Sequence, residues 1–230
     1  MTPLCYCCDQ PGTTDEHVPP LCLFPEGKDL PPGVDLRRNL ITVPSCPTHN
    51  LKKSGDDEYL MYILTMNLPV KEIGEHHFTT KVLRAIDRRP ALINRILEKT
   101  TPVTLQDGTT NEIFETAAIE IDGARLERVL RQVSLGLHRH HLGHNWAGSL
   151  RIHPEFLRFL HDPKALEWNT VLQSMSEYAD RLFNEAPLHG ENRDVFSYQL
   201  VTPDGRLPVA IRMHFYGGVR VLALFGSTGG

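Results

Sequence analysis

Four residues near the N-terminus have the types and the spacing of a metal site. Cys5 and Cys8 form one Cys-x-x-Cys pair, and Cys46 and His49 form a second pair of the same spacing. Two ligands separated by two residues on a tight turn can bind one ion, and two such pairs complete a closed tetrahedral zinc site. The spacing therefore predicts one structural zinc, with Cys7 as an alternative to Cys5 in the ligand set.

The use of cysteine favours a metal over disulfides. The chain has five cysteines, and all of them lie within its first 46 residues. A disulfide framework is normally even in number and spread along a short secreted chain. Cys22 is expected to be a small buried apolar side chain. The N-terminus lacks a secretory pattern and no apolar stretch is long enough to span a bilayer, so we expect a cytoplasmic location without membrane contact.

Glu16, His17 and Asn50 add a second kind of chemistry. A neutral imidazole can take a proton from water near neutral pH, and carboxylate and amide oxygens are the donors that magnesium and manganese prefer. Together these groups suit phosphodiester hydrolysis, in which one cation relieves the charge on the phosphate. In a regular strand Glu16 and His17 point to opposite faces, so a bulge or bend is expected if both serve one site.

The net charge of −4 is unevenly distributed. Residues 1–60 contain five basic and nine acidic residues, whereas the remaining 170 contain 19 of each. A protein that binds nucleic acid through counterion release is usually basic. A nucleic-acid substrate would therefore need cations, another surface or a partner to bring it to the first 60 residues.

Apolar spacing predicts an α+β fold in three parts. Residues 1–68 are turn-rich and hold every cysteine, which is typical of a small metal-held module. Residues 69–109 are expected to form a helical connector in which Pro90 starts or kinks a helix. Residues 110–230 are expected to form an α+β domain that binds a protein partner or forms a homodimer.

Several elements of the second half can be placed by their apolar periodicity. Extended segments flank a turn at 106–109, and a helix follows with one apolar face from 126 to 137. Further helices are expected near 154–161 and 163–184. The tail is expected to form antiparallel strands over 195–201, 209–215 and 219–225, the first two joined through Pro203-Asp204-Gly205.

Three short motifs make the N-terminal part resemble a known superfamily. They are Glu-His-Val-Pro-Pro from Glu16, Asn-Leu-Ile-Thr-Val-Pro-Ser-Cys from Asn39, and His-Asn-x-x-Lys-Ser-x-Asp-Asp-Glu-Tyr from His49. They resemble the HNH endonucleases, and more narrowly a group of bacterial HNH proteins, from Cys5 to about residue 60. The resemblance implies a zinc-bound ββα-metal module that hydrolyses nucleic acid, with DNA as the expected substrate, in bacterial defence or in a mobile element.

The resemblance also implies a role for each matching residue. His17 resembles the general base, and Glu16 and Asn50 resemble the ligands of a catalytic magnesium or manganese ion. Asn39 resembles the residue that braces the base and its loop. The residues that resemble the structural zinc set are Cys5, Cys8, Cys46 and His49.

Two positions depart from the pattern of the superfamily. Many members have Asp where this chain has Glu16, and a Cys is common where this chain has His49. The second departure allows a competing register in which His49 is a catalytic residue and zinc is bound by cysteines alone. The adjacency of His49 and Asn50 favours the first assignment, because it keeps the zinc-pair spacing with the catalytic residue directly after it.

Simpler explanations compete with these assignments. A non-catalytic zinc-stabilised module that binds a partner or nucleic acid would explain the cysteines, but not the positions of Glu16-His17, Asn39 and Asn50. Ser54 is expected to begin a helix with acidic residues in its first turn, and Lys52 and Lys53 contact a phosphate or lie on a solvated face. A second metal site would be conceivable among His138, His140, His141 and His144, but solvent exposure or a place at a helix end is the expected role of these histidines.

Overall fold

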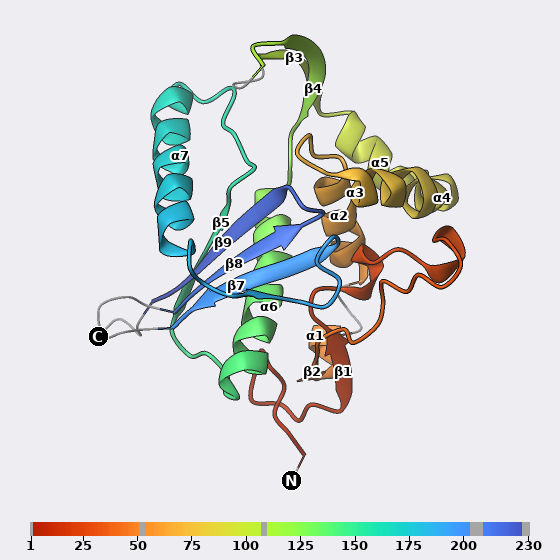
Figure 1. Cartoon of the computed structure of the whole chain (residues 1–230), viewed down its shortest axis with the longest axis vertical. Coiled ribbons are helices and arrows are strands. Elements are labelled where there is room, and N and C mark those ends of the chain that lie inside the picture. Colours follow the sequence, from red (N-terminus) through yellow and green to blue (C-terminus); the bar gives the residue numbers. More distant parts are fainter. Residues whose placement is uncertain (1, 51–53, 107–109, 203–208, 227–230) are drawn as a thin grey trace.

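The structure is a computed structural model that describes residues 2–50, 54–106, 110–202 and 209–226. It confirms a mixed α+β fold with an antiparallel C-terminal sheet (Figure 1). Lys52, Lys53 and the turns expected at 107–109 and at Pro203-Asp204-Gly205 lie outside the described residues. The strands are β1 Thr14–His17, β2 Thr42–Ser45, β3 Thr100–Gln106, β4 Ile113–Ile119, β5 Ser149–Pro154, β6 Leu188–His189, β7 Phe196–Val201, β8 Val209–Phe215 and β9 Val219–Gly226.

The helices lie mostly between the small N-terminal strands and the large sheet in the sequence. Short 3-10 turns η1 and η2 cover Leu21–Leu23 and Gly27–Asp29, and a π-helical turn η4 covers Phe78–Val82. The α-helices are α1 Pro47–Asn50, α2 Ser54–Thr65, α3 Glu72–His77, α4 Leu83–Arg88, α5 Pro90–Leu97, α6 Gly123–Leu142 and α7 Ala165–Leu182. Pro90 begins α5 as expected, because its missing N–H is tolerated at the first turn of a helix. Within the described ranges, no helix combines the length and the apolar character needed to cross a bilayer.

The N-terminal strands form a small hairpin-like pair followed by helices. β1 and β2 are antiparallel, with Thr14 opposite Ser45 and His17 opposite Thr42. Every residue of β1 has one partner, so the bulge expected at Glu16 and His17 does not occur within this pair. The described part of α2 starts at Ser54, directly after residues that the structure does not describe, and it carries acidic residues in its first turn, where the helix dipole favours them.

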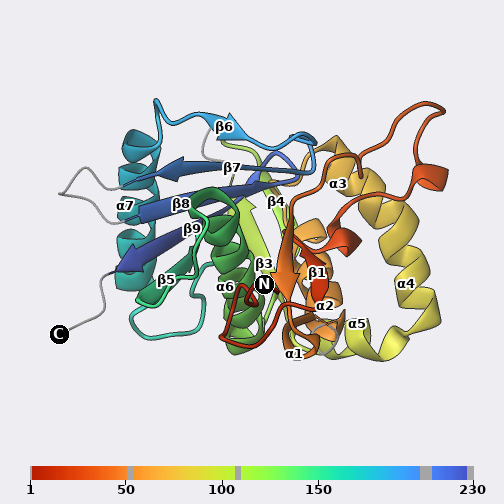
Figure 2. The same ribbon diagram turned by 90° about the horizontal axis from the view of Figure 1, so that it is seen from below.

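The large sheet has the strand order β5-β9-β8-β7-β6, and all neighbouring strands are antiparallel. The three strands expected at the tail are confirmed as β7, β8 and β9. Alternate residues of β8 serve the two faces: Ile211 belongs to the main core, whereas Ala210 packs with Ala179 and Phe183 at the end of α7. Figure 2 shows α7 on one side of this sheet and α6 on the other.

The helix expected near 154–161 was wrong. Strand β5 runs to Pro154 and pairs with β9, and no helix occurs between Glu155 and Lys164. The side chain of Glu155 is buried and accepts two hydrogen bonds from the Arg212 guanidinium, at 2.8 and 2.6 Å. A long-range ion pair therefore fixes this segment, and sequence periodicity carries no sign of it.

Helix α6 joins the N-terminal strands to the large sheet. Asp122 caps it by accepting a hydrogen bond from the Arg125 backbone N–H at 3.0 Å, and its expected apolar face is buried. One side of α6 lies against β2 and α2 and another lies near β5. At Gly136 an added Cβ would lie 2.6 Å from Val18 Cγ2, so only glycine allows this close approach. A single hydrophobic cluster consequently includes side chains of both the N-terminal module and the large sheet.

Candidate metal centre and adjoining pocket

The four predicted zinc ligands lie together. His49 Nδ1 is 3.5 Å from Cys5 Sγ, 3.5 Å from Cys8 Sγ and 3.3 Å from Cys46 Sγ. Cys8 Sγ and Cys46 Sγ are 3.9 Å apart. Around a tetrahedral zinc with ordinary bond lengths, the sulfur–nitrogen edges would be about 3.6 Å and the sulfur–sulfur edges about 3.8 Å. The cluster therefore has the size that a structural zinc requires.

The choice among the candidate ligands follows from this geometry. All four ligand atoms lie within 4.8 Å of one another, and Cys7 is not part of the group. His49 belongs to the cluster, so the candidate zinc site has the composition Cys3His rather than cysteines alone. Cys22 is half-buried against the core, and its thiol donates to the Asp57 backbone carbonyl at 3.4 Å.

Backbone hydrogen bonds hold the two ligand pairs close together. Cys5 lies on a tight loop closed by its own N–H donating to the Gln10 carbonyl at 2.8 Å. Cys46 precedes α1, and the His49 N–H donates to the Cys46 carbonyl at 3.0 Å. The Tyr6 N–H donates to the Pro44 carbonyl at 2.9 Å, which joins the loop to β2. Short-range turns and the single backbone hydrogen bond from Tyr6 to Pro44 thus bring the ligands together.

The charge state of the Cys46 sulfur suits a metal, whereas burial raises the pKa of Cys8. Burial raises the pKa of Cys46, but hydrogen bonds from the His49 and Thr48 backbone N–H groups and from the His49 side chain outweigh it and lower the pKa to about 6. A thiolate is the form of cysteine that binds zinc. Cys46 is therefore prepared for a metal by the first turn of α1.

A pocket of about 330 Å³ lies directly beside the metal centre, because Asn50 follows His49 in α1. Its lining comes from β1, from the segment around η1, from α1 and from the first turn of α2. Its lining residues are Asp15, Glu16, His17, Pro20, Leu21, Cys22, Asn50, Ser54 and Asp57.

Asn50 is held in this pocket by its amide nitrogen. Nδ2 donates to Thr14 Oγ1 at 3.0 Å and to the Asp15 carbonyl at 3.2 Å. The side-chain carbonyl oxygen is then the atom of Asn50 that remains to bind a cation. The metal centre and β1 together fix its direction.

His17 has one covered ring nitrogen. Nδ1 is buried without a hydrogen-bond partner among the described residues, whereas Nε2 is not covered in this way. Nε2 is therefore the nitrogen that can exchange a proton with a water molecule in the pocket.

Glu16 and Asp15 both line the pocket, but they differ in exposure. Glu16 is only 6% exposed, whereas Asp15 is exposed and lies two residues before His17 on a regular strand. Residues at this spacing share a face. Asp15 is therefore a further candidate ligand, which the strand alternation could have indicated before the structure was known.

Asn39 lies apart from this pocket lining. It is an exposed turn residue with a left-handed backbone (φ 52°), a conformation in which Asn is enriched among non-glycine residues. Its place in the loop before β2 agrees with a role in shaping the turn, and the Val18 N–H donates to the Ile41 carbonyl at 2.9 Å just beyond it.

No family model, curated protein or solved structure matches this chain.

The histidines near the end of α6 do not form a second metal site. Among the described residues, the Cys3His cluster is the one group of at least three His, Cys, Asp or Glu side chains that lie close enough to share an ion. His140 and His144 are exposed as expected. His138 is not: it is fully buried, and its ring stacks on Phe225 with centroids 5.1 Å apart. His141 contacts the Tyr198 hydroxyl at 2.7 Å, so these two side chains serve packing between α6 and the sheet.

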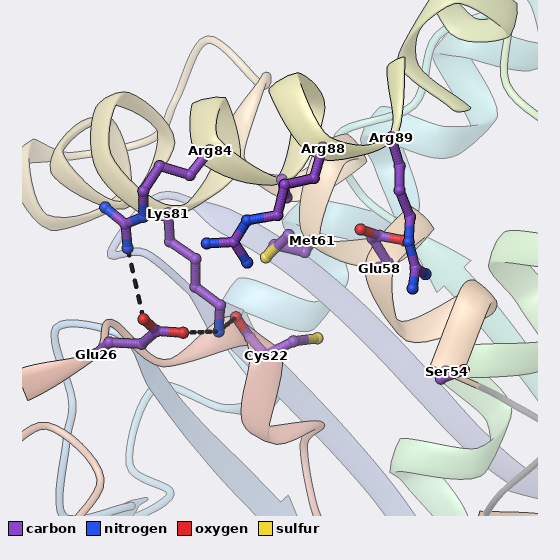
Figure 3. A pocket seen from close by; sticks show the side chains of 10 residues that line it. Cys22, Glu26, Ser54, Glu58, Met61, Lys81, Arg84, Arg88 and Arg89 are labelled. Atoms are coloured by element: carbon purple, nitrogen blue, oxygen red, sulfur yellow. Dashed lines mark hydrogen bonds and ion pairs between the residues drawn. The ribbon is translucent and has the colours of Figure 1, made fainter. Parts of the chain in front are cut away.

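A second, basic pocket adjoins the first and was not foreseen from the sequence. Lys81, Arg84, Arg88 and Arg89 line it, together with Glu26 and Glu58 (Figure 3). Lys81, Arg84 and Arg88 follow the i, i+3, i+7 spacing of one helical face. This spacing is visible in the sequence and could have revealed a basic stripe.

Proposed function

We propose that this protein is a metal-dependent endonuclease of the HNH type that hydrolyses phosphodiester bonds of nucleic acid, with DNA as the expected substrate. The observation that carries the proposal is the shared pocket of His17, Asn50 and two neighbouring carboxylates beside a Cys3His cluster. The order of elements, two antiparallel strands followed by a helix, is compatible with an HNH module.

The metal centre has a structural role in this proposal. Zinc bound by three cysteines and one histidine has no open coordination position, so it does not itself activate water. It would hold the N-terminal loop, α1 and β2 together, and through α1 it would fix Asn50 beside His17.

The pocket residues have separate tasks. His17 accepts a proton from the attacking water, and its covered Nδ1 leaves Nε2 for this purpose. The Asn50 carbonyl oxygen and a carboxylate of β1 would hold a magnesium or manganese ion. Glu16 serves as this ligand if the strand bends at the site, because in the regular strand it points away from the face of His17, whereas Asp15 shares that face. When bound, this cation supplies a Lewis acid for the phosphate and the leaving oxygen. The oxygen donors on the pocket lining fit such an ion, because hard divalent cations prefer oxygen ligands.

The proposal is tested by cleavage of plasmid and single-stranded DNA in the presence of magnesium or manganese. His17→Ala should lose at least about 10²-fold in rate, since a positioned general base contributes that much. Zinc content and Tm should stay at the wild-type values. Asn50→Ala and Glu16→Ala should also cleave more slowly, but excess cation should restore part of their rate, because a lost ligand weakens ion binding.

A non-catalytic zinc-stabilised module that binds a partner or nucleic acid is the second candidate. The position of Asn39 outside the pocket lining favours it, because the superfamily pattern connects this residue with the base. Absence of cleavage of DNA and RNA by the wild-type protein with either cation would select this candidate. Cleavage that is unchanged in His17→Ala would instead place the base elsewhere.

A further inference from the structure

The basic pocket lies between the η1–η2 segment and the helical run η4–α4 (Figure 3). It has a volume of about 280 Å³, and four cationic side chains line it against two carboxylates. Arginine keeps its charge at all ordinary pH values. The pocket therefore carries a net positive charge, although the N-terminal residues 1–60 beside it are acidic overall.

Two of the cations are already held by acidic partners. Arg84 donates to both carboxylate oxygens of Asp29, at 2.9 and 2.6 Å, and lies 3.5 Å from Glu26. Lys81 donates to the Cys22 carbonyl at 3.0 Å and lies 3.9 Å from Glu26. These contacts anchor η4 and α4 against the loop of the N-terminal module.

The other two cations have no such partners. Arg88 and Arg89 are exposed, and neither guanidinium makes a hydrogen bond or an ion pair with any residue that the structure describes. Glu58, the second carboxylate of the pocket, accepts a hydrogen bond from the Tyr62 hydroxyl at 3.3 Å. Two guanidinium groups consequently remain to bind an anion, and their planar fork matches the geometry of phosphate oxygens.

The basic pocket adjoins the pocket of His17. Cys22 and Ser54 line both of them. A strand whose scissile phosphate lay beside His17 would place neighbouring phosphates at the basic pocket. Phosphate contacts of this kind fix the position of a strand and do not depend on its sequence.

We infer that Arg88 and Arg89 form a subsite for a backbone phosphate of the nucleic-acid strand, next to the bond that is cut. This inference rests on the proposed function. It also explains how an acidic module binds a polyanion, because the neighbouring helical run supplies the cations that the module lacks. Arg84 and Lys81 act as positioning residues that hold this face against η1 and η2.

Binding can be measured separately from cleavage. In the His17→Ala background, fluorescence anisotropy with labelled single-stranded and duplex DNA reports Kd at several salt concentrations. Arg88→Gln/Arg89→Gln should raise Kd at least about 10-fold at low salt and reduce the slope of log Kd against log salt by about 1 to 2, since each phosphate contact contributes roughly one unit. Because both side chains are exposed, Tm should not change.

The matched control is Arg95→Gln/Arg181→Gln. It removes the same charge from exposed positions on α5 and α7, outside either pocket lining. Equal Kd values and salt slopes for the two pairs would overturn the subsite. So would a protein that binds inorganic phosphate in competition assays but binds no DNA or RNA, because the pocket would then be a site for a free anion.

The outcomes for the subsite and for the proposed reaction are distinguishable. In the protein that retains His17, the double variant Arg88→Gln/Arg89→Gln should raise KM and leave kcat nearly unchanged. If no cleavage occurs but DNA or RNA binding depends on these arginines, the subsite stands and the nuclease proposal fails. If cleavage depends on His17 but the arginine pair has wild-type KM and Kd, the nuclease proposal stands and the subsite fails.

Discussion

Different interactions stabilise the N-terminal module and the C-terminal sheet. β1 and β2 have only four residues each, and the side chains that bring their surroundings together are the Cys3His cluster. Strands β7, β8 and β9 have six to eight residues, and alternate positions of β8 are buried on both faces. We expect that a module with so short a pair of strands depends on a metal, and that the sheet, which buries more apolar surface, is stable without one.

Helix α6 is where these two regions meet. Its apolar face packs on the shared core, Gly136 contacts Val18 directly after His17, and Asn145 donates from beyond its C-terminal end to the Cys5 carbonyl at 2.7 Å. Loss of the metal should therefore damage the N-terminal module first, whereas changes at α6 should affect both regions.

Loss of a zinc ligand should have the largest effect. Cys46→Ser should abolish zinc binding and unfold residues 1–60, because structural zinc contributes on the order of 10 kcal/mol of apparent binding free energy in small zinc modules. Elemental analysis and hydrogen exchange measure this, with β1 and β2 losing protection while β8 and β9 keep it. Cys7→Ser is the matched control and should keep one zinc per chain. A well-folded wild-type protein without zinc would contradict the metal-held module.

The sheet should be most sensitive at its buried ion pair. Arg212→Met leaves the Glu155 carboxylate buried without its bidentate partner and should lower the free energy of unfolding by about 3 to 5 kcal/mol. Zinc content of the folded protein should not change. Chemical denaturation checks the value, and Arg220→Met, at a half-exposed side chain of the same ion-pair network, should cost less than about 1 kcal/mol. Equal losses in the two variants would show that burial does not set the strength of this network.

The contact between α6 and β1 should respond to a single methyl group. Gly136→Ala should lower the free energy of unfolding by about 1 to 3 kcal/mol, because the new Cβ overlaps Val18. Since Val18 follows His17, the cleavage rate should fall as well. Gly123→Ala adds the same atom to α6 where nothing lies within 4 Å, and its Tm should match that of the wild type. A Gly136→Ala protein with unchanged stability would mean that α6 can move away from β1 freely.

The smallest effect is expected at Asn145. Asn145→Ala removes the hydrogen bond to the Cys5 carbonyl and should lower the free energy of unfolding by about 1 kcal/mol. The release of zinc to a chelator should become modestly faster, which a colorimetric zinc assay measures. If zinc release is unchanged, the C-terminal end of α6 contributes nothing to the metal centre.

The sequence indicated those features that depend on local spacing. The zinc ligands could be named because Cys-x-x-Cys and Cys-x-x-His pairs sit on tight turns, whose geometry is fixed over a few residues. Strands β8 and β9 could be placed by their apolar runs, and α6 by its buried face. The start of α5 at Pro90 follows in the same way from the chemistry of a single residue.

The tertiary structure decided everything that depends on contacts distant in sequence. The pairing of β5 with β9 and of Glu155 with Arg212 replaced an expected helix, because a buried ion pair between residues far apart leaves no local pattern. The unbroken register of β1 places Asp15 on the same face as His17, which makes Asp15 a candidate cation ligand in addition to Glu16. The contacts of η4 with η1 and of α4 with η2 placed Arg88 and Arg89 in a pocket that adjoins the pocket of His17. Helical spacing defines a stripe of charge, but only packing determines what that stripe faces.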